Sequence, residues 1–341
     1  MQHGGYIFQI KEMAKLRRWL KVSALILVFL LLITGCNIGT SGEPAKGKME
    51  SGPIKIGVLR IEDNLPFFVA EEENLFAKNN VKVELVSFNS ARERDIALEA
   101  GEIHAELADL IAVGLMKKGG TDVKVVSLGL GVTPQEGRFA ILAAPNSNIE
   151  KPEDLKGIPI AISNNTIIHY LAEKMPREVG FKPEDIKTQS IPDIKLRLDS
   201  LLEGKDVQAA LLPDPLATLA EKMGAKVIID DTKLNTNLSQ TVILFRADTI
   251  KNQREDIKAV LKAYSEAAEK LNKKPEKYRA LIVEKARIPK PLENSYPAPT
   301  YSPLTLPKEE MINRVMDWMV EKGLLEKAYS YNEIMDTSFL K

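Results

Sequence analysis

Residues 98–109 (LEAGEIHAELAD) and residues 201–214 (LLEGKDVQAALLPD) share one pattern, and this pattern decides the fold. Each stretch contains the end of a helix, a glycine (Gly101 or Gly204), a short strand and then a turn that carries an aspartate. A helix-to-strand unit that occurs twice in one chain predicts two similar α/β halves.

Strand and helix patterns alternate around both stretches. This alternation predicts α/β lobes with mostly parallel sheets, whose ligands bind beyond the carboxyl ends of the strands. The segment 138–143 is apolar from Phe139 on and is expected to be buried on both faces, whereas Pro159 is typical of an edge strand. The expected strands are 54–59, 81–86, 103–107, 123–128, 138–143, 158–162, 224–229 and 241–245. The expected helices are 66–76, 90–101, 152–157, 166–175, 257–271 and 308–322.

Composition excludes several classes of function. Lys plus Arg and Asp plus Glu both number 47, so no net field attracts nucleic acid. The single cysteine, Cys36, allows no disulfide, and three histidines leave little for a metal site. No nucleophile motif or nucleotide-binding loop with its full set of residues is present. We therefore expect no catalytic residue, no metal and no cofactor.

The N-terminal region has the pattern of an export signal. A basic stretch precedes the apolar run 22–33, which is too short to span a bilayer, and Ile-Thr-Gly-Cys closes it at Cys36. This resembles a bacterial lipobox, which implies a signal peptide over 1–35 and lipidation of Cys36 as the link to the bilayer. An uncleaved anchor with a chance cysteine is the alternative, and either Met1 or Met13 could be the start. Residues 36–53 are rich in Gly, Ser, Pro and charge, which indicates a flexible tether.

Five segments, spread over nearly all of the mature chain, carry a resemblance to a known family. They are LPFFVAEEENLF (65–76), LEAGEIHA (98–105), DLKGIPIA (154–161), LEGKDVQA (202–209) and WMVEKGLL (318–325). In order and spacing they resemble the solute-binding proteins of ABC importers, in the branch that binds aliphatic sulfonates, nitrate or thiamine precursors. The sequence departs from the family pattern at His104, where Asp is usual, and at Asp214-Pro215, where Glu-Pro is commoner.

The resemblance implies a periplasmic binding protein-like type II fold, with two α/β lobes joined by a two-strand hinge around a central ligand cleft. Lobe one would comprise 54–138 plus 242–341, and lobe two 139–241. The chain would cross near Arg138-Phe139 and near Thr241-Val242. The implied partners are a small polar ligand, an ABC permease and its ATPase. The implied protein is a monomer on the extracytoplasmic face of the cell membrane.

Four loops at the expected strand ends carry the candidate ligand-binding residues. The first offers Glu62, Asp63 and Asn64, although solvation of a surface loop explains them equally well. The second offers Asp109, which could instead cap the helix that follows.

The third loop offers Asn164, Asn165 and Thr166, at a helix start whose N–H groups and dipole favour an anion. Plain helix capping is the alternative, and the neighbouring His169 is more typical of a packed residue than of a ligand contact. The fourth loop offers Asp214 in a rigid Pro-Asp-Pro turn. Tyr296 and Tyr301 could line the ligand or only cover lobe one.

The candidate residues combine several carboxylates with one helix start that attracts anions. Such a mixture suits a zwitterion or an amino-bearing heterocycle better than nitrate. Two other functions stay open: an enzyme of the same fold, of pyrimidine synthase or menaquinone-pathway type, and a sensor module that feeds a receptor.

Overall fold

A computed structural model describes residues 52–340 of the chain. The predicted signal peptide, the predicted lipidation site at Cys36 and almost all of the predicted tether lie outside the described residues. Within the described part, no helix is long and apolar enough to cross a membrane.

The first sheet has five strands in the order β2-β1-β3-β10-β4. The strand β10 runs antiparallel to both of its neighbours, and β1 is parallel to β2 and β3, so the sheet is mostly parallel as predicted. Its strands are β1 (Ile54–Leu59), β2 (Val83–Phe88), β3 (Ala105–Ala108), β4 (Val123–Leu128) and β10 (Val242–Arg246).

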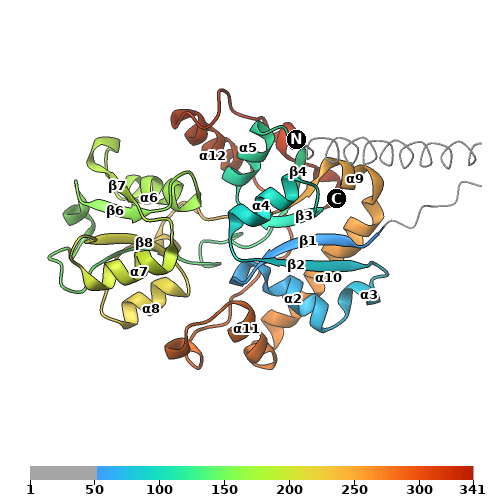
Figure 1. The fold of residues 1–341 in the computed structure, drawn as a ribbon, viewed down its shortest axis with the longest axis horizontal. Coiled ribbons are helices and arrows are strands. Elements are labelled where there is room, and N and C mark those ends of the chain that lie inside the picture. Colours follow the sequence, from blue (N-terminus) through green and yellow to red (C-terminus); the bar gives the residue numbers. More distant parts are fainter. Residues whose placement is uncertain (1–51, 341) are drawn as a thin grey trace, which may run out of the picture. The chain divides into compact units, whose positions relative to one another are not determined.

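Helices cover both faces of this sheet (Figure 1). Apolar side chains of α2, α3, α10 and α11 form one buried cluster with β1, and those of α4, α5 and α12 form another with β4. The helices are α2 (Leu65–Glu72), α3 (Leu75–Lys78), α4 (Ala91–Glu99), α5 (Leu110–Lys118), α9 (Ala247–Asn252), α10 (Arg254–Lys273), α11 (Arg279–Lys285), α12 (Glu309–Glu321) and α13 (Tyr331–Ile334).

The second sheet repeats this order with a different set of five strands, β7-β6-β8-β5-β9. Here β5 is the antiparallel strand, between β8 and β9. Its strands are β5 (Phe139–Ala143), β6 (Pro159–Ile162), β7 (Lys187–Ser190), β8 (Ala209–Pro213) and β9 (Lys226–Asp230). Its helices are α6 (Ile167–Glu178), α7 (Ile194–Glu203) and α8 (Leu216–Lys222).

The repeat seen in the sequence is a structural repeat. In the first sheet Gly57 pairs with both Val86 and Glu106, and in the second Ala161 pairs with both Gln189 and Ala210. The glycine that ends each helix has a positive φ, 77° at Gly101 and 64° at Gly204. A Cβ at Gly204 would lie 2.0 Å from the Asn146 side chain, so only glycine fits there.

The chain passes between the sheets twice. It leaves β4 for β5, and it leaves β9 for β10, so each sheet receives its antiparallel strand from a crossing. The two crossing segments bond to each other, because Gly129 N donates to Thr241 O at 2.8 Å and Thr241 N donates to Leu130 O at 2.9 Å. This pairing is consistent with the two-strand hinge that the resemblance implies.

The structure differs from the prediction at the helix 66–76, at the strand that begins with Pro159 and at β7. The helix expected over 66–76 is broken, because Asn74 adopts a left-handed conformation between α2 and α3. The strand that begins at Pro159 is not at the edge: β7 lies outside it, and Pro159 is tolerated as the first residue of the strand. The edge strand β7 (KTQS) was not expected, because its polar, mostly exposed residues have no apolar pattern.

The helix α12 contacts a helix of each half, α5 in the first and α6 in the second. It packs on α5 of the first sheet, while its Trp318 ring meets His169 and Tyr170 of α6 edge to face. The Trp318 Nε1–H donates to Glu173 Oε2 at 2.8 Å. This helix therefore joins the two halves on one side of the molecule.

Candidate functional site

Each candidate residue lies just beyond a strand. The first loop follows β1, Asp109 follows β3, residues 163–166 follow β6, and Asp214 follows β8. In parallel sheets these carboxyl ends share one edge, where ligands of such folds bind. The candidates therefore occupy equivalent edges of the two sheets.

Glu62 and Asp214, from different sheets, meet at Tyr296. The Tyr296 hydroxyl interacts with both carboxyl groups, and each of the two carboxyl groups raises the pKa of the tyrosine. A second tyrosine, Tyr301, holds the loop from behind, because its hydroxyl donates to the Glu62 carbonyl oxygen at 2.7 Å. The Pro-rich segment after α11 thus supports the first loop through Tyr301 and reaches the fourth through Tyr296.

The Glu62 side chain is buried and incompletely bonded. It is 6% exposed, and its Oε1 has no hydrogen-bond partner among the described residues. Burial raises its pKa to about 8, the nearby Asp214 and Asp63 add to the rise, and the Tyr296 hydroxyl opposes it. Glu62 is therefore mostly protonated at neutral pH, and a cation placed beside it would favour the charged form.

Asp214 has a structural role as well. Its Oδ1 accepts from the backbone N–H and the hydroxyl of Thr218, each at 2.9 Å, at the start of α8. The Arg138 Nη1 lies 3.5 Å from the same oxygen. Burial raises the pKa of Asp214, and Arg138 opposes this rise. The sequence did not indicate this partner, because Arg138 is remote from Asp214 along the chain.

Asp63 and Asp109 form a second acidic pair over the first sheet. Asp109 caps α5, accepting from the N–H groups of Ile111 and Ala112 at 2.8 and 2.9 Å, so capping is confirmed. Burial raises the pKa of Asp109 and raises that of Asp63 to about 6. Asp109 adds to the rise for Asp63, and Arg94 opposes the rise for both carboxyl groups.

Asn64 does not behave as a solvated loop residue. Its side chain is 0% exposed, and neither atom of its amide has a hydrogen-bond partner among the described residues. With Glu62 also buried, solvation of a surface loop does not explain these two residues. Buried polar groups normally have hydrogen-bond partners, and no described residue supplies one for Glu62 Oε1 or for the Asn64 amide.

The third loop caps α6 in the ordinary way. Thr166 Oγ1 accepts from Ile168 N at 3.2 Å and donates to Ser163 O at 2.7 Å. Asn165 has a φ of 59°, and its N–H donates to His169 Nδ1 at 3.3 Å. Asn164 and Asn165 are exposed. Capping is thus confirmed, and one of the N–H groups expected to face a ligand is already bonded.

His169 belongs to the link between α6 and α12. Its Nε2 lies 3.2 Å from Glu173 Oε1, which also pairs with Lys322 Nζ at 2.5 Å. Burial would raise the pKa of Glu173, but hydrogen bonds from His169, Lys322 and Trp318 outweigh it and lower the pKa to about 2. Packing explains this histidine without a ligand, as expected.

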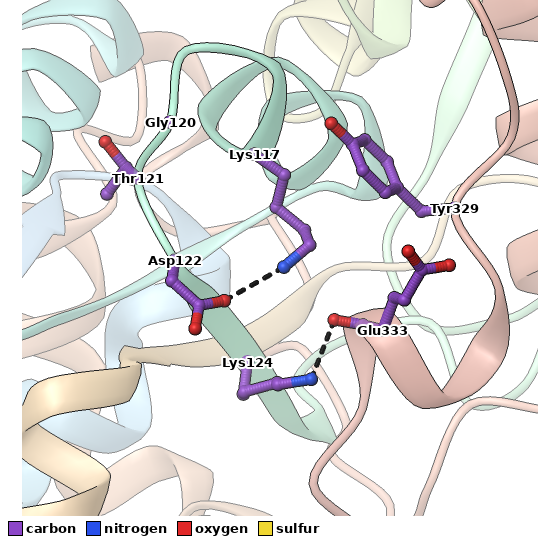
Figure 2. Close-up of a pocket in the computed structure, with 7 residues that line it drawn as sticks. All are labelled: Lys117, Gly120, Thr121, Asp122, Lys124, Tyr329 and Glu333. Atoms are coloured by element: carbon purple, nitrogen blue, oxygen red, sulfur yellow. Dashed lines mark hydrogen bonds and ion pairs between the residues drawn. The ribbon is translucent and has the colours of Figure 1, made fainter.

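A hollow of about 360 Å³ lies elsewhere, at the amino end of β4. Figure 2 shows Lys117 directed at Asp122, at 3.0 Å, and Lys124 directed at the Glu333 carbonyl oxygen, at 2.8 Å. Its charged groups therefore already have partners, and it lies at the opposite end of β4 from the candidate loops. No group of three or more His, Cys, Asp or Glu among residues 52–340 could hold a metal ion.

Sequence reasoning missed three arginines, each close to one of the candidate loops or at the equivalent position of the other sheet. Arg138 pairs with Asp214 and also with Asp230, the latter at 3.0 Å. Arg94 is buried and interacts with both Asp63 and Asp109, and Arg197 is buried at the equivalent position of the second half. The regular spacing of Arg94 and Arg197 ahead of the two repeated stretches was a signal that could have found them.

Known proteins share this arrangement of sheets and loops. A model of the NMT1-like family matches residues 47–284. The periplasmic aliphatic sulphonate binding protein SsuA from Escherichia coli has a similar structure, with 23% identity, a TM-score of 0.69, and coverage of 83% of this chain and 97% of that one. No curated protein sequence matches.

Two further solved structures show the range of proteins with this fold. The alkanesulfonate-binding protein SsuA from Xanthomonas axonopodis pv. citri, bound to MOPS, is 17% identical, with a TM-score of 0.69 and coverage of 85% of this chain and 99% of that one. The desulfurization enzyme DSZB is 13% identical, with a TM-score of 0.63 and coverage of 84% and 97%. The fold therefore serves both solute binding and catalysis.

Proposed function

Since this chain belongs to the NMT1-like family, we propose that it is an extracytoplasmic solute-binding lipoprotein that delivers a small polar solute to an ABC importer. Similar structures include solute-binding proteins of such importers, with the periplasmic aliphatic sulphonate binding protein SsuA among them. The lipobox-like sequence ending at Cys36 supports export and anchoring. An ABC permease and its ATPase are the proposed partners.

The observation that carries this proposal is the meeting of Glu62 and Asp214. They come from loops of the two different sheets, and their carboxyl groups share the Tyr296 hydroxyl. A solute bound there would contact both halves, which is how hinged binding proteins close around a ligand. We propose a boundary between the lobes at the two crossings, with 54–138 plus 242–341 in one lobe and 139–241 in the other.

The acidic groups favour a solute with a cationic or amino-bearing end. Glu62, Asp63, Asp109 and Asp214 would all face it, and the pKa of each is raised by burial. A cation in this position would replace the missing partner of Glu62 and lower its pKa. We retain Asn164, Asn165 and Thr166 as contacts at the opposite end of the solute.

A solute screen by thermal unfolding tests the proposal. Aminosulfonates, amino acids, aminopyrimidines, alkanesulfonates and nitrate would each be added to the purified protein. A true ligand at 100 times its dissociation constant adds about 2.7 kcal/mol to the free energy of unfolding. Stabilisation by none of these classes would count against the proposed solute range, and turnover of a stabilising compound would favour the enzyme alternative.

A further inference from the structure

The structural repeat identifies two arginines that occupy the same position in the two halves. Val86 of β2 and Gln189 of β7 are equivalent, since each pairs with the same position of its neighbouring strand. Four residues beyond each lies the N-cap of a helix, Ser90 for α4 and Asp193 for α7. Arg94 and Arg197 follow their caps by the same four residues.

Arg94 has its full set of partners. It is 3% exposed, its Nε lies 3.3 Å from Glu106 Oε2, and its Nη1 donates to the Leu107 carbonyl oxygen at 2.6 Å. Its Nε and Nη2 also donate to Asp95. In the first half, therefore, the buried cation is neutralised within the protein.

Arg197 has lost these partners. It is only 1% exposed, yet its Nε and Nη1 have no hydrogen-bond partner among the described residues, and no ion pair joins it. The residue equivalent to Glu106 is Ala210, and the residue equivalent to Asp95 is Leu198. Both counter-ions have been replaced by apolar side chains.

An unpaired buried charge is costly, by several kcal/mol for an ion without compensation, so a group of this kind points to a missing partner. Burial lowers the pKa of Arg197 to about 10 and the Asp193 carboxylate, which forms no ion pair with it, opposes this fall, so Arg197 stays charged at neutral pH. The missing partner is therefore an anion.

The position of Arg197 in the first turns of α7 favours a guanidinium directed toward the strand ends. Helical side chains lean toward the amino end of their helix, and for α7 that end lies beyond the carboxyl end of β7. Arg94 follows this rule, since it reaches the carbonyl of Leu107 near the end of β3. The loop after β7 also adjoins the loop after β6, because Ile191 N donates to Ile162 O at 2.8 Å.

We propose that Arg197 is the anion-binding residue of the second half, placed to receive the negatively charged group of the solute near Asn164 and Thr166. This inference rests on the proposed function and makes it more specific. The solute would be a zwitterion, with its cationic group at Glu62 and Asp214 and its carboxylate, sulfonate or phosphate group at Arg197. The anion would reach Arg197 when the two halves separate.

The test uses sulfate as the probe, on the whole protein and on Arg197→Met, which keeps the side-chain volume but removes the charge. Thermal unfolding would be followed with increasing sodium sulfate, at an ionic strength held constant with sodium chloride. The parent protein should show a saturable rise in Tm. Arg197→Met should bind sulfate roughly 10- to 100-fold more weakly, the effect of losing a charged hydrogen bond, and should unfold at the same or a higher temperature without sulfate.

The matched control is Arg94→Met, which should lower Tm because it leaves Glu106 buried without its partner. Arg197→Lys, which keeps the charge, should retain part of the sulfate response. An equal response of the parent protein and Arg197→Met would mean an adventitious ion only. A decrease in Tm for Arg197→Met as large as that for Arg94→Met would show that Arg197 only stabilises the fold. Either result overturns the assignment.

The assignment and the proposed function fail in different ways. A solute that binds the parent protein and Arg197→Met with equal affinity would overturn the subsite and leave solute binding intact. Saturable sulfate binding at Arg197, in a protein that binds no organic solute, would support the subsite and count against the proposed function.

Discussion

The two acidic residues that meet at Tyr296 differ in what already surrounds them. Glu62 has one oxygen without a partner, whereas one oxygen of Asp214 is bonded to Thr218 and faces Arg138. An added cation therefore gains more from Glu62 than from Asp214. This difference separates a group held ready for a ligand from one that also builds the fold.

Glu62→Gln should change how stability depends on pH. The native pKa of Glu62, about 8, lies above the usual glutamate pKa of 4.5, so between these values the native state holds a proton that the unfolded state has released. Stability of the parent protein should therefore fall as pH rises through this window, by on the order of 1–3 kcal/mol more than in Glu62→Gln. Urea unfolding at pH 5, 6.5 and 8 measures it.

The exposed Glu71, exchanged for Gln, is the control for this series, and it should follow the parent protein. Identical slopes for the parent protein and Glu62→Gln would show that the Glu62 carboxyl ionises as it does in the unfolded chain.

Asp214 can be tested for its two roles separately. Asp214→Asn keeps an oxygen for Thr218, so it should unfold near the parent, whereas Asp214→Ala leaves the N–H of Thr218 unpaired and should lose about 1–2 kcal/mol. Both substitutions should weaken the binding of an amino-bearing solute, and Asp214→Ala should do so by roughly 2–5 kcal/mol. Calorimetric titration measures the binding. Parental affinity in Asp214→Ala would mean that this carboxylate only shapes the turn.

The apolar strands and the capped helices could be predicted from the sequence, whereas the polar edge strand could not. Ser90 caps α4 through a bond to Glu93 N, as its position predicted, and the apolar strand β5 lies inside its sheet. The strand β7 has no apolar alternation, because it lies at an edge and only pairing with β6 makes it a strand. The break at Asn74 depends on one residue's backbone conformation, which no periodicity records.

The link between α6 and α12 should be sensitive to acid. Glu173 has a native pKa of about 2, below the usual glutamate pKa of 4.5, so its stabilising effect is present above pH 4.5 and is lost as pH falls toward 2. Glu173→Gln should therefore cost about 1–3 kcal/mol near neutral pH, and this difference should shrink at acid pH.

Chemical denaturation of Glu173→Gln at pH 3 and at pH 7 measures this. Glu321→Gln is a suitable control, since Glu321 forms a more exposed pair with Arg177. A cost for Glu173→Gln that is equal at the two pH values would mean that its charge contributes nothing to this link.

For the whole molecule, the sequence predicted two halves and the loops at their edges, but not which groups meet. The repeat at Gly101 and Gly204 was visible in the chain and corresponds to two sheets of identical order. The meeting of Glu62 with Asp214, and the pairing of Arg138 with Asp214, join residues far apart in sequence. The first contact depends on how the two crossings place one sheet against the other, and the second on the pairing of Phe139 with Pro213 inside the second sheet. Local sequence pattern encodes neither.

We propose that the molecule is anchored through Cys36. If this cysteine carries the lipid, Cys36→Ser should abolish fatty-acid labelling and the cleavage before residue 36, while the thermal unfolding of the folded part stays unchanged. Metabolic labelling with a fatty acid, followed by fractionation, measures this. Labelling that persists in Cys36→Ser would contradict the lipobox assignment.

We expect the two halves to close around a solute, and solution X-ray scattering with and without a saturating ligand measures this closure. Hinged binding proteins close when a ligand bridges their halves, so the radius of gyration should decrease on binding. Glu62→Gln combined with Arg197→Met, measured at the same ligand concentration, should keep the dimensions of the ligand-free protein. Equal dimensions of the parent protein with and without a ligand whose binding has been verified by calorimetry would contradict the account.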